Sequence, residues 1–307
     1  MKVLLFGGRG FMGEQFLKIF PDAVCPSVDI ADPGAVAQVL DQEKPDIVIN
    51  AAGRTGVPNV DWCEDHKLET LRSNVTGPLV LLEECAKRGI YWVHLSSGCI
   101  YEGQKRQEGE EGKEGVGWTE EDEPNFSGSF YSRSKAWSEK TLRECTVRDV
   151  RGRSGILILR LRMPFDGSTH PKNLLTKLAR FERVLDVPNS ITYLPDFLAA
   201  AKTLVERRST GIYNVVNDGV ISPYRIVELY RELVDPAHRF ERLLVSSLPQ
   251  VVRAGRSNCV LSTSKLREQG IHLRPVEEAV RESLLEFKKT SWESAESTIK
   301  NKNCVQY

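Results

Sequence analysis

The sequence has no excess of charge of either sign, because 42 lysine and arginine residues balance 42 aspartates and glutamates. A chain without net charge has no general electrostatic attraction for nucleic acid or for an anionic membrane surface. Uninterrupted apolar runs are also short, and none approaches the roughly 20 residues that a membrane-spanning helix needs. We therefore expect neither a nucleic-acid partner nor a membrane partner.

Cysteine is scarce and shows no functional spacing. The seven cysteines form an odd set without a C-x-x-C pair, and the histidines lie at no spacing typical of metal ligands. The sequence therefore indicates neither a metal site nor a disulfide framework. Residues 1–6 have the pattern of a strand rather than of a signal peptide. A reducing compartment, the cytoplasm, is the expected location.

What the sequence does contain is an alternation of strand and helix patterns. Short apolar runs predict strands at residues 2–6, 46–50, 92–97, 155–160 and 211–216. Amphipathic patterns between them predict helices at residues 11–20, 69–87 and 130–144. This alternation is typical of an α/β fold in which helices cover both faces of a parallel sheet. Residues 102–123 are rich in glycine and charge, and either a mobile lid or a plain insertion would explain them.

A glycine-rich turn connects the first predicted strand to the first predicted helix. Its sequence, Gly7-Gly8-Arg9-Gly10-Phe11-Met12-Gly13, has the strand–turn–helix context that a dinucleotide fingerprint requires. Glycines let the backbone approach a pyrophosphate, and the free N–H groups of the helix N-terminus stabilise its charge. A plain strand–helix turn would show the same glycines. Their place at the start of an alternating α/β pattern favours cofactor binding.

We therefore predict an α/β, Rossmann-type, doubly wound parallel sheet that binds a dinucleotide. The predicted cofactor-binding domain comprises residues 1–162 and a return strand at about residues 190–217. Residues 163–189 and 218–290 would form a smaller α/β region that binds the substrate. Residues 291–307 are polar and are predicted to be a frayed tail.

The choice between the two nicotinamide cofactors rests on two side chains. Arg9, inside the glycine turn, could pair its guanidinium with the 2′-phosphate of NADP(H), although it could also be a solvated surface arginine. Asp29 lies where a carboxylate would bind the ribose of NAD(H), but the residues after it resemble a helix entry. We interpret Asp29 and Ile30 as residues at the adenine edge or at a helix cap. NADP(H) is the predicted cofactor, and NAD(H) is the alternative.

Small residues end the second clear strand. Asn50-Ala51-Ala52-Gly53 leaves space where bulk would collide with a bound cofactor, although close helix–strand packing would favour the same residues. Asn74, on the following predicted helix, could hold a water molecule, or it could only cap or bend that helix. We predict that all five residues lie in the cofactor site.

Tyr131 and Lys135 are four residues apart on a predicted helix and therefore share one face. A neighbouring ammonium group favours the phenolate and would lower a phenol pKa that is otherwise about 10. Tyr131 could then act as an acid or a base near neutral pH. A Y-x-x-x-K pattern is common by chance, but here it follows the glycine turn, the 50–53 segment and the Ser96-Ser97 strand end in order.

Together these motifs resemble the extended short-chain dehydrogenase/reductases that act on nucleotide sugars. More narrowly, the chain is similar to dTDP-4-dehydrorhamnose reductases, and most of all to bifunctional UDP-4-keto-6-deoxyglucose 3,5-epimerase/4-reductases. The resemblance covers about residues 1–285, and the segments that carry it are residues 50–64, 98–100, 124–132, 160–164 and 211–214. Gly255, where relatives usually have proline, and the longer charged loop depart from the family pattern.

The resemblance implies a Ser97–Tyr131–Lys135 triad that reduces the keto group at carbon 4 of the sugar. Ser97 would bind the keto oxygen, Tyr131 would supply its proton, and Lys135 would hold the nicotinamide ribose. The resemblance also implies that Cys99 and Lys177 form an acid/base pair that inverts carbons 3 and 5. Without the family, an inert buried thiol and a helix-face lysine would be the better explanations.

A wider set of residues is implied to bind the nucleotide sugar. Guanidinium groups match phosphate oxygens, and the residues implied to contact the uridine diphosphate are Arg162, Lys172, Asn173 and Arg256. Surface salt bridges would explain each of these residues individually. The residues implied to surround the sugar are Thr55, Val57, Asn59, Ser97, Gly98, Cys99, Asn125 and Lys177.

We therefore expect an NADPH-dependent enzyme that converts UDP-4-keto-6-deoxyglucose to UDP-β-L-rhamnose and that could form a homodimer. A dTDP-4-dehydrorhamnose reductase without epimerase activity is one alternative, which the presence of both Cys99 and Lys177 disfavours. A non-catalytic regulatory subunit on the same fold is another, which the intact Ser97, Tyr131 and Lys135 disfavour. The sequence leaves the nucleotide base, uridine or thymidine, open.

Overall fold

The computed structural model describes the backbone of residues 1–57, 59–105, 116–145, 155–250 and 252–303. Side chains are described for the same residues except Pro249 and residues 291–303. Most of the predicted charged loop therefore lies outside the described residues, and so does the end of the predicted tail.

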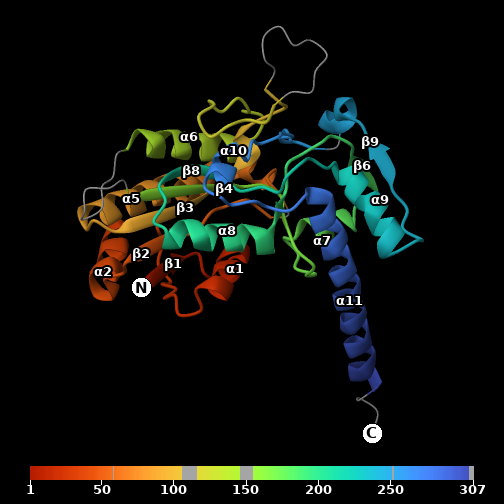
Figure 1. Cartoon of the computed structure of the whole chain (residues 1–307), viewed down its shortest axis with the longest axis horizontal. Coiled ribbons are helices and arrows are strands. Elements are labelled where there is room, and N and C mark those ends of the chain that lie inside the picture. The colour runs from red at the N-terminus through yellow and green to blue at the C-terminus, as the bar shows by residue number, and fades with distance from the viewer. Residues whose placement is uncertain (58, 106–115, 146–154, 251, 304–307) are drawn as a thin grey trace.

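Five parallel strands form the central sheet, in the order β1-β2-β3-β4-β8 (Figure 1). They are β1 (Val3–Phe6), β2 (Ile47–Asn50), β3 (Tyr91–Ser97), β4 (Ile156–Leu161) and β8 (Gly211–Asn214). Val24 forms a bridge with Leu4 on the side of β1 that faces away from β2. After β1 the chain therefore passes first along one side of this strand and then crosses to the other side, where it forms β2. The strand order reverses at β1, which is where doubly wound sheets bind ligands. The predicted parallel Rossmann-type sheet is confirmed.

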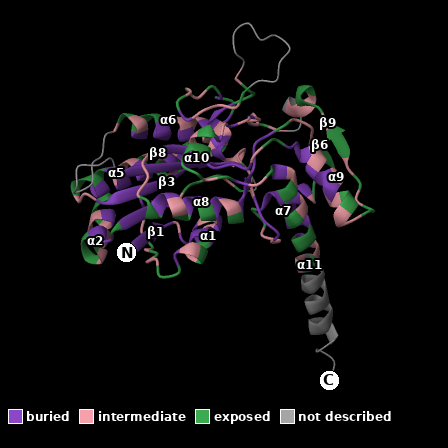
Figure 2. Cartoon of the chain, viewed as in Figure 1, coloured by how far each residue is buried: buried purple, intermediate pink, exposed green. Residues whose placement is uncertain are grey.

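Helices cover both faces of this sheet. On one face, α1 (Phe11–Ile19) and α8 (Leu194–Glu206) pack against Leu5, Ile49 and Val93. On the other face, α2 (Pro33–Glu43), α5 (Gly77–Lys87) and α6 (Phe130–Glu144) pack against Leu4, Val48 and Trp92. Because both faces are buried, the strands are continuous apolar runs rather than alternating ones. Figure 2 shows the buried residues concentrated in the strands.

A second group of elements follows β4 and shares a separate hydrophobic core, which includes Phe165, Leu175, Ile226 and Val280. Two short parallel pairs, β5 with β7 and β6 with β9, lie in this group. Its elements are β5 (Pro164–Phe165), α7 (Leu174–Leu178), β6 (Arg183–Leu185), β7 (Thr192–Tyr193), α9 (Pro223–Leu233), β9 (Glu241–Leu243) and α11 (Val276–Asn303). They fall in the ranges predicted for the substrate-binding region, and the domain division itself stays a prediction.

Two predicted elements differ in the structure. The predicted helix at residues 69–87 is divided into α4 (Lys67–Leu71), a π-helical turn (Arg72–Thr76) and α5. Pro78 contributes to this change of pitch because it has no N–H to donate to the preceding turn. The backbone of residues 291–303 is helical within α11, whereas the sequence predicted fraying from residue 291. Alanine, glutamate and lysine in that stretch favour helix despite its polarity.

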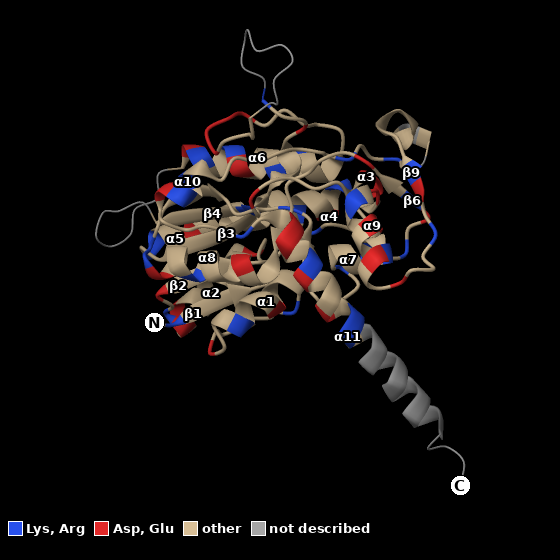
Figure 3. Cartoon of the chain, turned by 45° about the vertical axis from the view of Figure 1, so that its right-hand side comes forward, with Lys and Arg blue, Asp and Glu red and all other residues tan. Residues whose placement is uncertain are grey.

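Basic and acidic residues occur on most of the described elements. In Figure 3, segments with Lys or Arg and segments with Asp or Glu are interspersed along the ribbon. Among the described residues, none of the helices is both long and apolar enough to cross a bilayer. The same residues include no group of three or more histidine, cysteine or acidic side chains placed to hold a metal ion.

The glycine turn after β1 is tightly packed against the end of β2. Gly7 has a left-handed φ of 79°, and a Cβ atom on it would lie 2.4 Å from the backbone N of Ala52. A Cβ on Gly13 would lie 2.1 Å from the carbonyl oxygen of Gly7. Backbone atoms cannot move away as a flexible side chain can. Glycine is therefore required at both positions, for conformation at one and for close approach at both.

Replacing Gly13 with alanine should destabilise the fold by about 1–3 kcal/mol or more, since the new methyl group overlaps backbone. Gly34, in the first turn of α2, is a matched control because its Cβ would meet nothing nearer than 3.5 Å. Gly34→Ala should be neutral or stabilising by up to about 1 kcal/mol, since alanine favours helix. Urea unfolding of both variants measures the difference, and equal effects would contradict this account of the turn.

Candidate active site

The candidate residues meet at the carboxyl end of the sheet. Gly7 follows β1, the Asn50–Gly53 segment follows β2, Ser97 ends β3, and Arg162 directly follows β4. Parallel strands place all of these ends at one edge of the sheet. This edge is where sites in doubly wound folds lie.

Helix α6 brings Tyr131 to the end of β3. Its N-terminus is capped by Ser129, whose Oγ accepts a hydrogen bond from the Ser132 N–H at 3.1 Å. Ser97 caps the short 3₁₀ turn Gly98–Ile100, and its Oγ accepts from the Cys99 N–H at 3.2 Å. The Tyr131 phenol faces the side chains of Ser97 and Cys99 as hydrogen-bonding neighbours. The structure thus brings these three predicted catalytic side chains together.

The predicted lowering of the Tyr131 pKa by Lys135 is not found in the structure, where the Tyr131 pKa is raised. Burial raises the pKa of Tyr131 well above its ordinary value, Cys99 raises it further, and Ser97 lowers it. Lys135 is not among these influences. Its Nζ instead donates to the Leu95 carbonyl at 3.0 Å, and burial lowers the pKa of Lys135 itself. The raised pKa favours the protonated phenol of Tyr131, which suits the predicted role of proton donor.

Asn74 fastens the loop after β2 to α6. Its Oδ1 accepts from the Arg54 N–H at 2.7 Å, and its Nδ2 donates to the Arg54 carbonyl at 2.9 Å and to Ser134 Oγ at 3.1 Å. A Cβ on Gly53 would lie 3.5 Å from Asn74 Oδ1 and 4.0 Å from Lys135 Nζ, so these residues are neighbours. The side chain is fully buried in the π-helical turn. These contacts hold the loop after β2 (residues 50–54, the predicted cofactor loop) against α6. This role was not among those predicted for Asn74.

Burial shifts the pKa values of the two residues of the predicted acid/base pair, Cys99 and Lys177, in opposite directions. It raises the pKa of the Cys99 thiol, and Ser97, Ser132, Arg162 and Lys135 oppose that shift. It lowers the pKa of Lys177 on α7, and the charge of Lys172 lowers it further. Both side chains are partly exposed. The described residues show no contact between Cys99 and Lys177, so their pairing stays a prediction.

The predicted cofactor residues at the turn have mixed roles. Arg9 is exposed, and Gly10 is the N-cap of α1. Met12 packs on one hydrophobic core, and Phe11 stacks on His170 with ring centroids 4.5 Å apart. That stack joins the turn to the loop before α7, a contact that no local sequence pattern predicts. Gly8 and Gly13 are buried.

Asn50 and Asp29 have partners within the protein. Asn50 is buried, its Nδ2 lies 3.2 Å from His94 Nδ1, and its Oδ1 accepts from the Ala52 N–H at 3.0 Å. Asp29 accepts from the Ala31 N–H at 2.9 Å and pairs with Arg72 at 2.8 Å, and these contacts lower its pKa. Asp32, not Asp29, caps α2. Ile30 packs against α5, where a Cβ on Gly77 would lie 2.4 Å from it.

Several of the residues predicted around the sugar lie on the loops after β2 and before α6. Thr55 and Val57 are exposed, and Asn59 Oδ1 accepts from the Asp61 N–H at 2.8 Å. Asn125 is also exposed, and its amide binds the N–H and carbonyl of Glu102 at 2.9 and 3.1 Å. Gly98 is buried, because a Cβ there would lie 2.6 Å from Leu261.

Two of the residues predicted to bind diphosphate, Asn173 and Arg256, have hydrogen-bond or ion-pair partners within the protein. Asn173 is buried, caps α7, and donates to the carbonyls of Asp166 at 2.9 Å and Ser168 at 2.6 Å. Arg256 pairs with Asp61 at 2.8 Å. Lys172 is exposed. Asn173 therefore has a structural role, and Asp61 is a partner of Arg256 that the sequence could not reveal, since 195 positions separate them.

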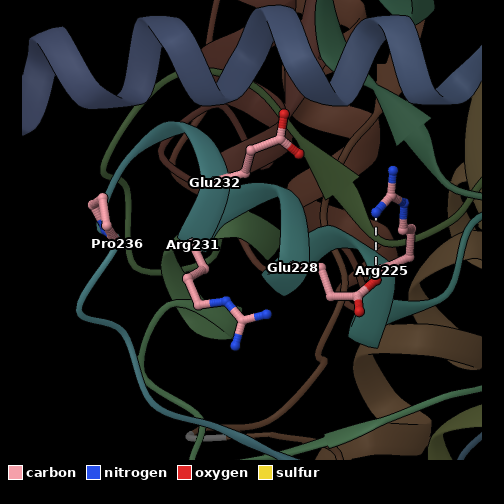
Figure 4. A pocket seen from close by; sticks show the side chains of 5 residues that line it. All are labelled: Arg225, Glu228, Arg231, Glu232 and Pro236. Carbon is pink, nitrogen blue, oxygen red and sulfur yellow. Dashed lines mark hydrogen bonds and ion pairs between the residues drawn. The ribbon is translucent and has the colours of Figure 1, made fainter.

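A surface hollow lies on α9 and not at this site (Figure 4). Its lining is charged and contains Arg225, Glu228, Arg231, Glu232 and Pro236. Arg225 pairs with Glu228 at 3.4 Å. None of the candidate site residues lines this hollow.

A profile of the RmlD substrate binding domain matches residues 1–289. The chain belongs to this family. An Arabidopsis thaliana protein named bifunctional dTDP-4-dehydrorhamnose 3,5-epimerase/dTDP-4-dehydrorhamnose reductase is 39% identical over 289 residues, which are 92% of this chain and 91% of that protein. The predicted resemblance to dTDP-4-dehydrorhamnose reductases and bifunctional epimerase/reductases is confirmed.

Further similar proteins have names that refer to the same group of nucleotide-sugar enzymes. A trifunctional UDP-glucose 4,6-dehydratase/UDP-4-keto-6-deoxy-D-glucose 3,5-epimerase/UDP-4-keto-L-rhamnose reductase of Arabidopsis thaliana is 36% identical, and the match covers 94% of this chain but only 41% of that protein. The crystal structure of the L780 UDP-rhamnose synthase from Acanthamoeba polyphaga mimivirus has a TM-score of 0.84 at 30% identity and covers 93% of this chain and 99% of that one. A dTDP-4-dehydrorhamnose reductase from Bacillus anthracis in complex with NADP shares the fold, with a TM-score of 0.74 at 21% identity, over 94% of this chain and 99% of that one.

Proposed function

We propose that this protein is an NADPH-dependent enzyme that epimerises UDP-4-keto-6-deoxyglucose at carbons 3 and 5 and reduces it at carbon 4, giving UDP-β-L-rhamnose. The observation that carries the proposal is the meeting of Ser97, Cys99 and Tyr131 at the end of β3, with Lys135 beside the cofactor loop. One cluster thus contains the groups for both chemistries. Relatives of 30–39% identity are named for the same two reactions or for UDP-rhamnose synthesis.

In the reduction, NADPH would supply the hydride to carbon 4. Ser97 donates a hydrogen bond to the keto oxygen, and Tyr131 transfers its phenolic proton to that oxygen as the hydride arrives. The raised pKa of Tyr131 keeps this proton in place until the oxygen becomes basic. The developing tyrosinate is then stabilised by Ser97, and Lys135 is the nearest cation on the same helix face.

In the epimerisation, a base removes the proton next to the ketone, and an acid returns one to the opposite face. We assign the base to Lys177, because its lowered pKa makes the neutral amine accessible. We assign the acid to Cys99, because its raised pKa keeps the thiol protonated. The neutral amine of Lys177 takes the proton from the ring carbon, and the electron pair of that bond is delocalised onto the keto oxygen. The thiol of Cys99 then gives its proton to the opposite face of the same carbon, and proton exchange with solvent restores both groups.

The nucleotide and the cofactor are the finer parts of the proposal. Relatives are named for both uridine and thymidine substrates, and we propose uridine because the L780 structure is a UDP-rhamnose synthase. NADPH is proposed because Arg9 is exposed in the glycine turn, and the Bacillus anthracis reductase was solved with NADP. The cytoplasmic location and the homodimer stay predictions.

Deuterium exchange separates the two reactions. Cys99→Ser and Lys177→Met should suppress deuterium uptake from solvent into the keto sugar, since a serine hydroxyl barely ionises and methionine is no base. Tyr131→Phe should preserve that exchange but slow reduction by about 10²–10⁴-fold, since it removes only the proton donor. Mass spectrometry of the sugar nucleotide, with oxidised cofactor present, measures exchange. Unchanged exchange in both Cys99→Ser and Lys177→Met would leave only the 4-reductase alternative.

Cofactor choice is tested at Arg9. Arg9→Ala should weaken NADPH binding by about 10-fold or more and NADH binding much less, because only NADPH carries the 2′-phosphate. Lys18→Ala removes an exposed cation at the other end of α1 and should change neither. Fluorescence titration with both cofactors measures this. An equal loss for NADPH and NADH would show that Arg9 does not select the phosphate.

A further inference from the structure

Two buried arginines at the end of β4 differ in one respect. Arg160 is fully buried and binds the carboxylate of Glu139, with Nε 3.1 Å from each carboxylate oxygen. Arg162 is only 4% exposed, yet it has no carboxylate partner among the described residues. Its Nη1 donates to Ser257 Oγ at 2.9 Å, and its Nη2 donates to Asn189 Oδ1 at 2.6 Å and to the Ser257 carbonyl. All of these acceptors are neutral.

The positive charge of Arg162 is therefore buried without compensation. Its Nε is also buried and has no hydrogen-bond partner among the described residues. A buried charge without a counter-ion is costly for a fold and is rare without a reason. Arg160, two residues earlier in the same chain segment, shows the usual arrangement. The difference indicates that Arg162 faces a group that is negative during part of the reaction.

The packing around Gly98 places Arg162 beside the turn that carries Cys99. A Cβ on Gly98 would lie 3.6 Å from Arg162 Cδ, so the arginine stem lies against the turn that carries Cys99. Cys259 closes the same corner, and its Sγ donates to the Gly98 carbonyl at 3.2 Å. The guanidinium is buried, and its Nη atoms donate three hydrogen bonds, all to Ser257 and Asn189. The role of Arg162 as a diphosphate ligand, which the resemblance implies, stays a prediction.

We propose that Arg162 is the fixed positive charge that stabilises the thiolate of Cys99 during epimerisation. The proposal deepens the proposed function, because it rests on Cys99 being the acid. When the thiol gives its proton to the ring carbon, the electron pair stays on sulfur, and the uncompensated charge of Arg162 stabilises it. Arg162 acts through Cys99 and is a positioning residue.

The groups that face Cys99 determine the sign of the expected change. Burial raises the thiol pKa, and the groups that lower it are Ser97, Ser132, Arg162 and Lys135. Tyr131 and Cys259 are its other titratable neighbours. Of the two cations, Lys135 also contacts Leu95 and belongs to the reductase triad. Removing the charge of Arg162 must therefore raise the pKa of Cys99.

The test measures the ionisation of Cys99 without substrate. The full-length protein is alkylated with iodoacetamide over a range of pH, and the rate at each cysteine is followed by mass spectrometry, with Cys99→Ser to assign the signal. Arg162→Gln should raise the pH midpoint of Cys99 alkylation by about one unit, which is about tenfold less thiolate below the midpoint. Arg162→Lys should restore the midpoint to near the wild-type value. The exposed thiol of Cys25 is an internal reference and should not change.

Three further variants at Ser257 make the result decisive. Ser257→Ala removes a neutral partner of Arg162 and should leave the midpoint in place. If Arg162→Gln does not fold, Ser257→Asp gives the guanidinium a counter-ion, and it should raise the midpoint relative to Ser257→Asn. A midpoint unchanged in Arg162→Gln, or equal in Ser257→Asp and Ser257→Asn, overturns the proposal. If UDP affinity falls in Arg162→Gln while the midpoint stays, Arg162 is a diphosphate ligand after all.

The outcome is separable from the proposed function. Alkylation needs neither sugar nor cofactor, so the electrostatic link between Arg162 and Cys99 is measured even if the protein does not epimerise. With the keto sugar, the pH profile of deuterium exchange in Arg162→Gln should shift in the same direction as the alkylation midpoint. Wild-type protein that shows no exchange would contradict the proposed function, and a shift in alkylation alone would then limit Arg162 to tuning a thiol of unknown use.

Discussion

The geometry of the site depends on how helix α6 docks against the end of β3. Three residues at successive turns of the helix, Tyr131, Lys135 and Glu139, engage three successive residues of the strand. Tyr131 faces Ser97, Lys135 donates to the Leu95 carbonyl at 3.0 Å, and Glu139 accepts from Ser96 Oγ at 2.6 Å. The buried pair of Glu139 with Arg160 fixes the helix further along its length. A shift of one residue in this register would separate the phenol from the serine.

Burial supplies the second constraint, because it acts differently on acids and amines. It disfavours the charged form of every group, so it raises the pKa values of Tyr131 and Cys99 and lowers those of Lys135 and Lys177. The pKa shifts therefore favour the protonated form of the two proposed proton donors, Tyr131 and Cys99, and the neutral form of the proposed base, Lys177. The same low polarity makes each remaining charge effective over a longer distance. The proposed action of the Arg162 guanidinium on the Cys99 thiol depends on this low polarity.

The sequence predicted the parts of the structure that depend on local pattern. The parallel sheet, the glycine turn and the span of α6 all follow from periodicity and from motifs within a few residues. The strand carrying Ser97 and the face shared by Tyr131 and Lys135 were also predicted, so their meeting at one sheet edge could be foreseen. The direction of the Tyr131 pKa shift could not be, since it depends on burial by residues from distant parts of the chain.

The contacts that the sequence did not predict join residues that are far apart in the chain. Asp61 pairs with Arg256, Arg162 with Asn189 and Ser257, and Phe11 stacks on His170. None of these contacts has a local signature. The candidate diphosphate ligands were chosen by residue type and resemblance, and type alone does not reveal that Asn173 is committed to capping α7.

The most direct test of the central claim is one incubation of the purified protein with UDP-4-keto-6-deoxyglucose and NADPH, with the product identified by NMR. A site that combines a proton donor at Tyr131 with an acid at Cys99 predicts NADPH oxidation and UDP-β-L-rhamnose, with carbons 3 and 5 inverted. Reduction without inversion would contradict the assignment of Cys99 and Lys177. The absence of any NADPH oxidation would contradict the assignment of Ser97, Tyr131 and Lys135 as a working triad.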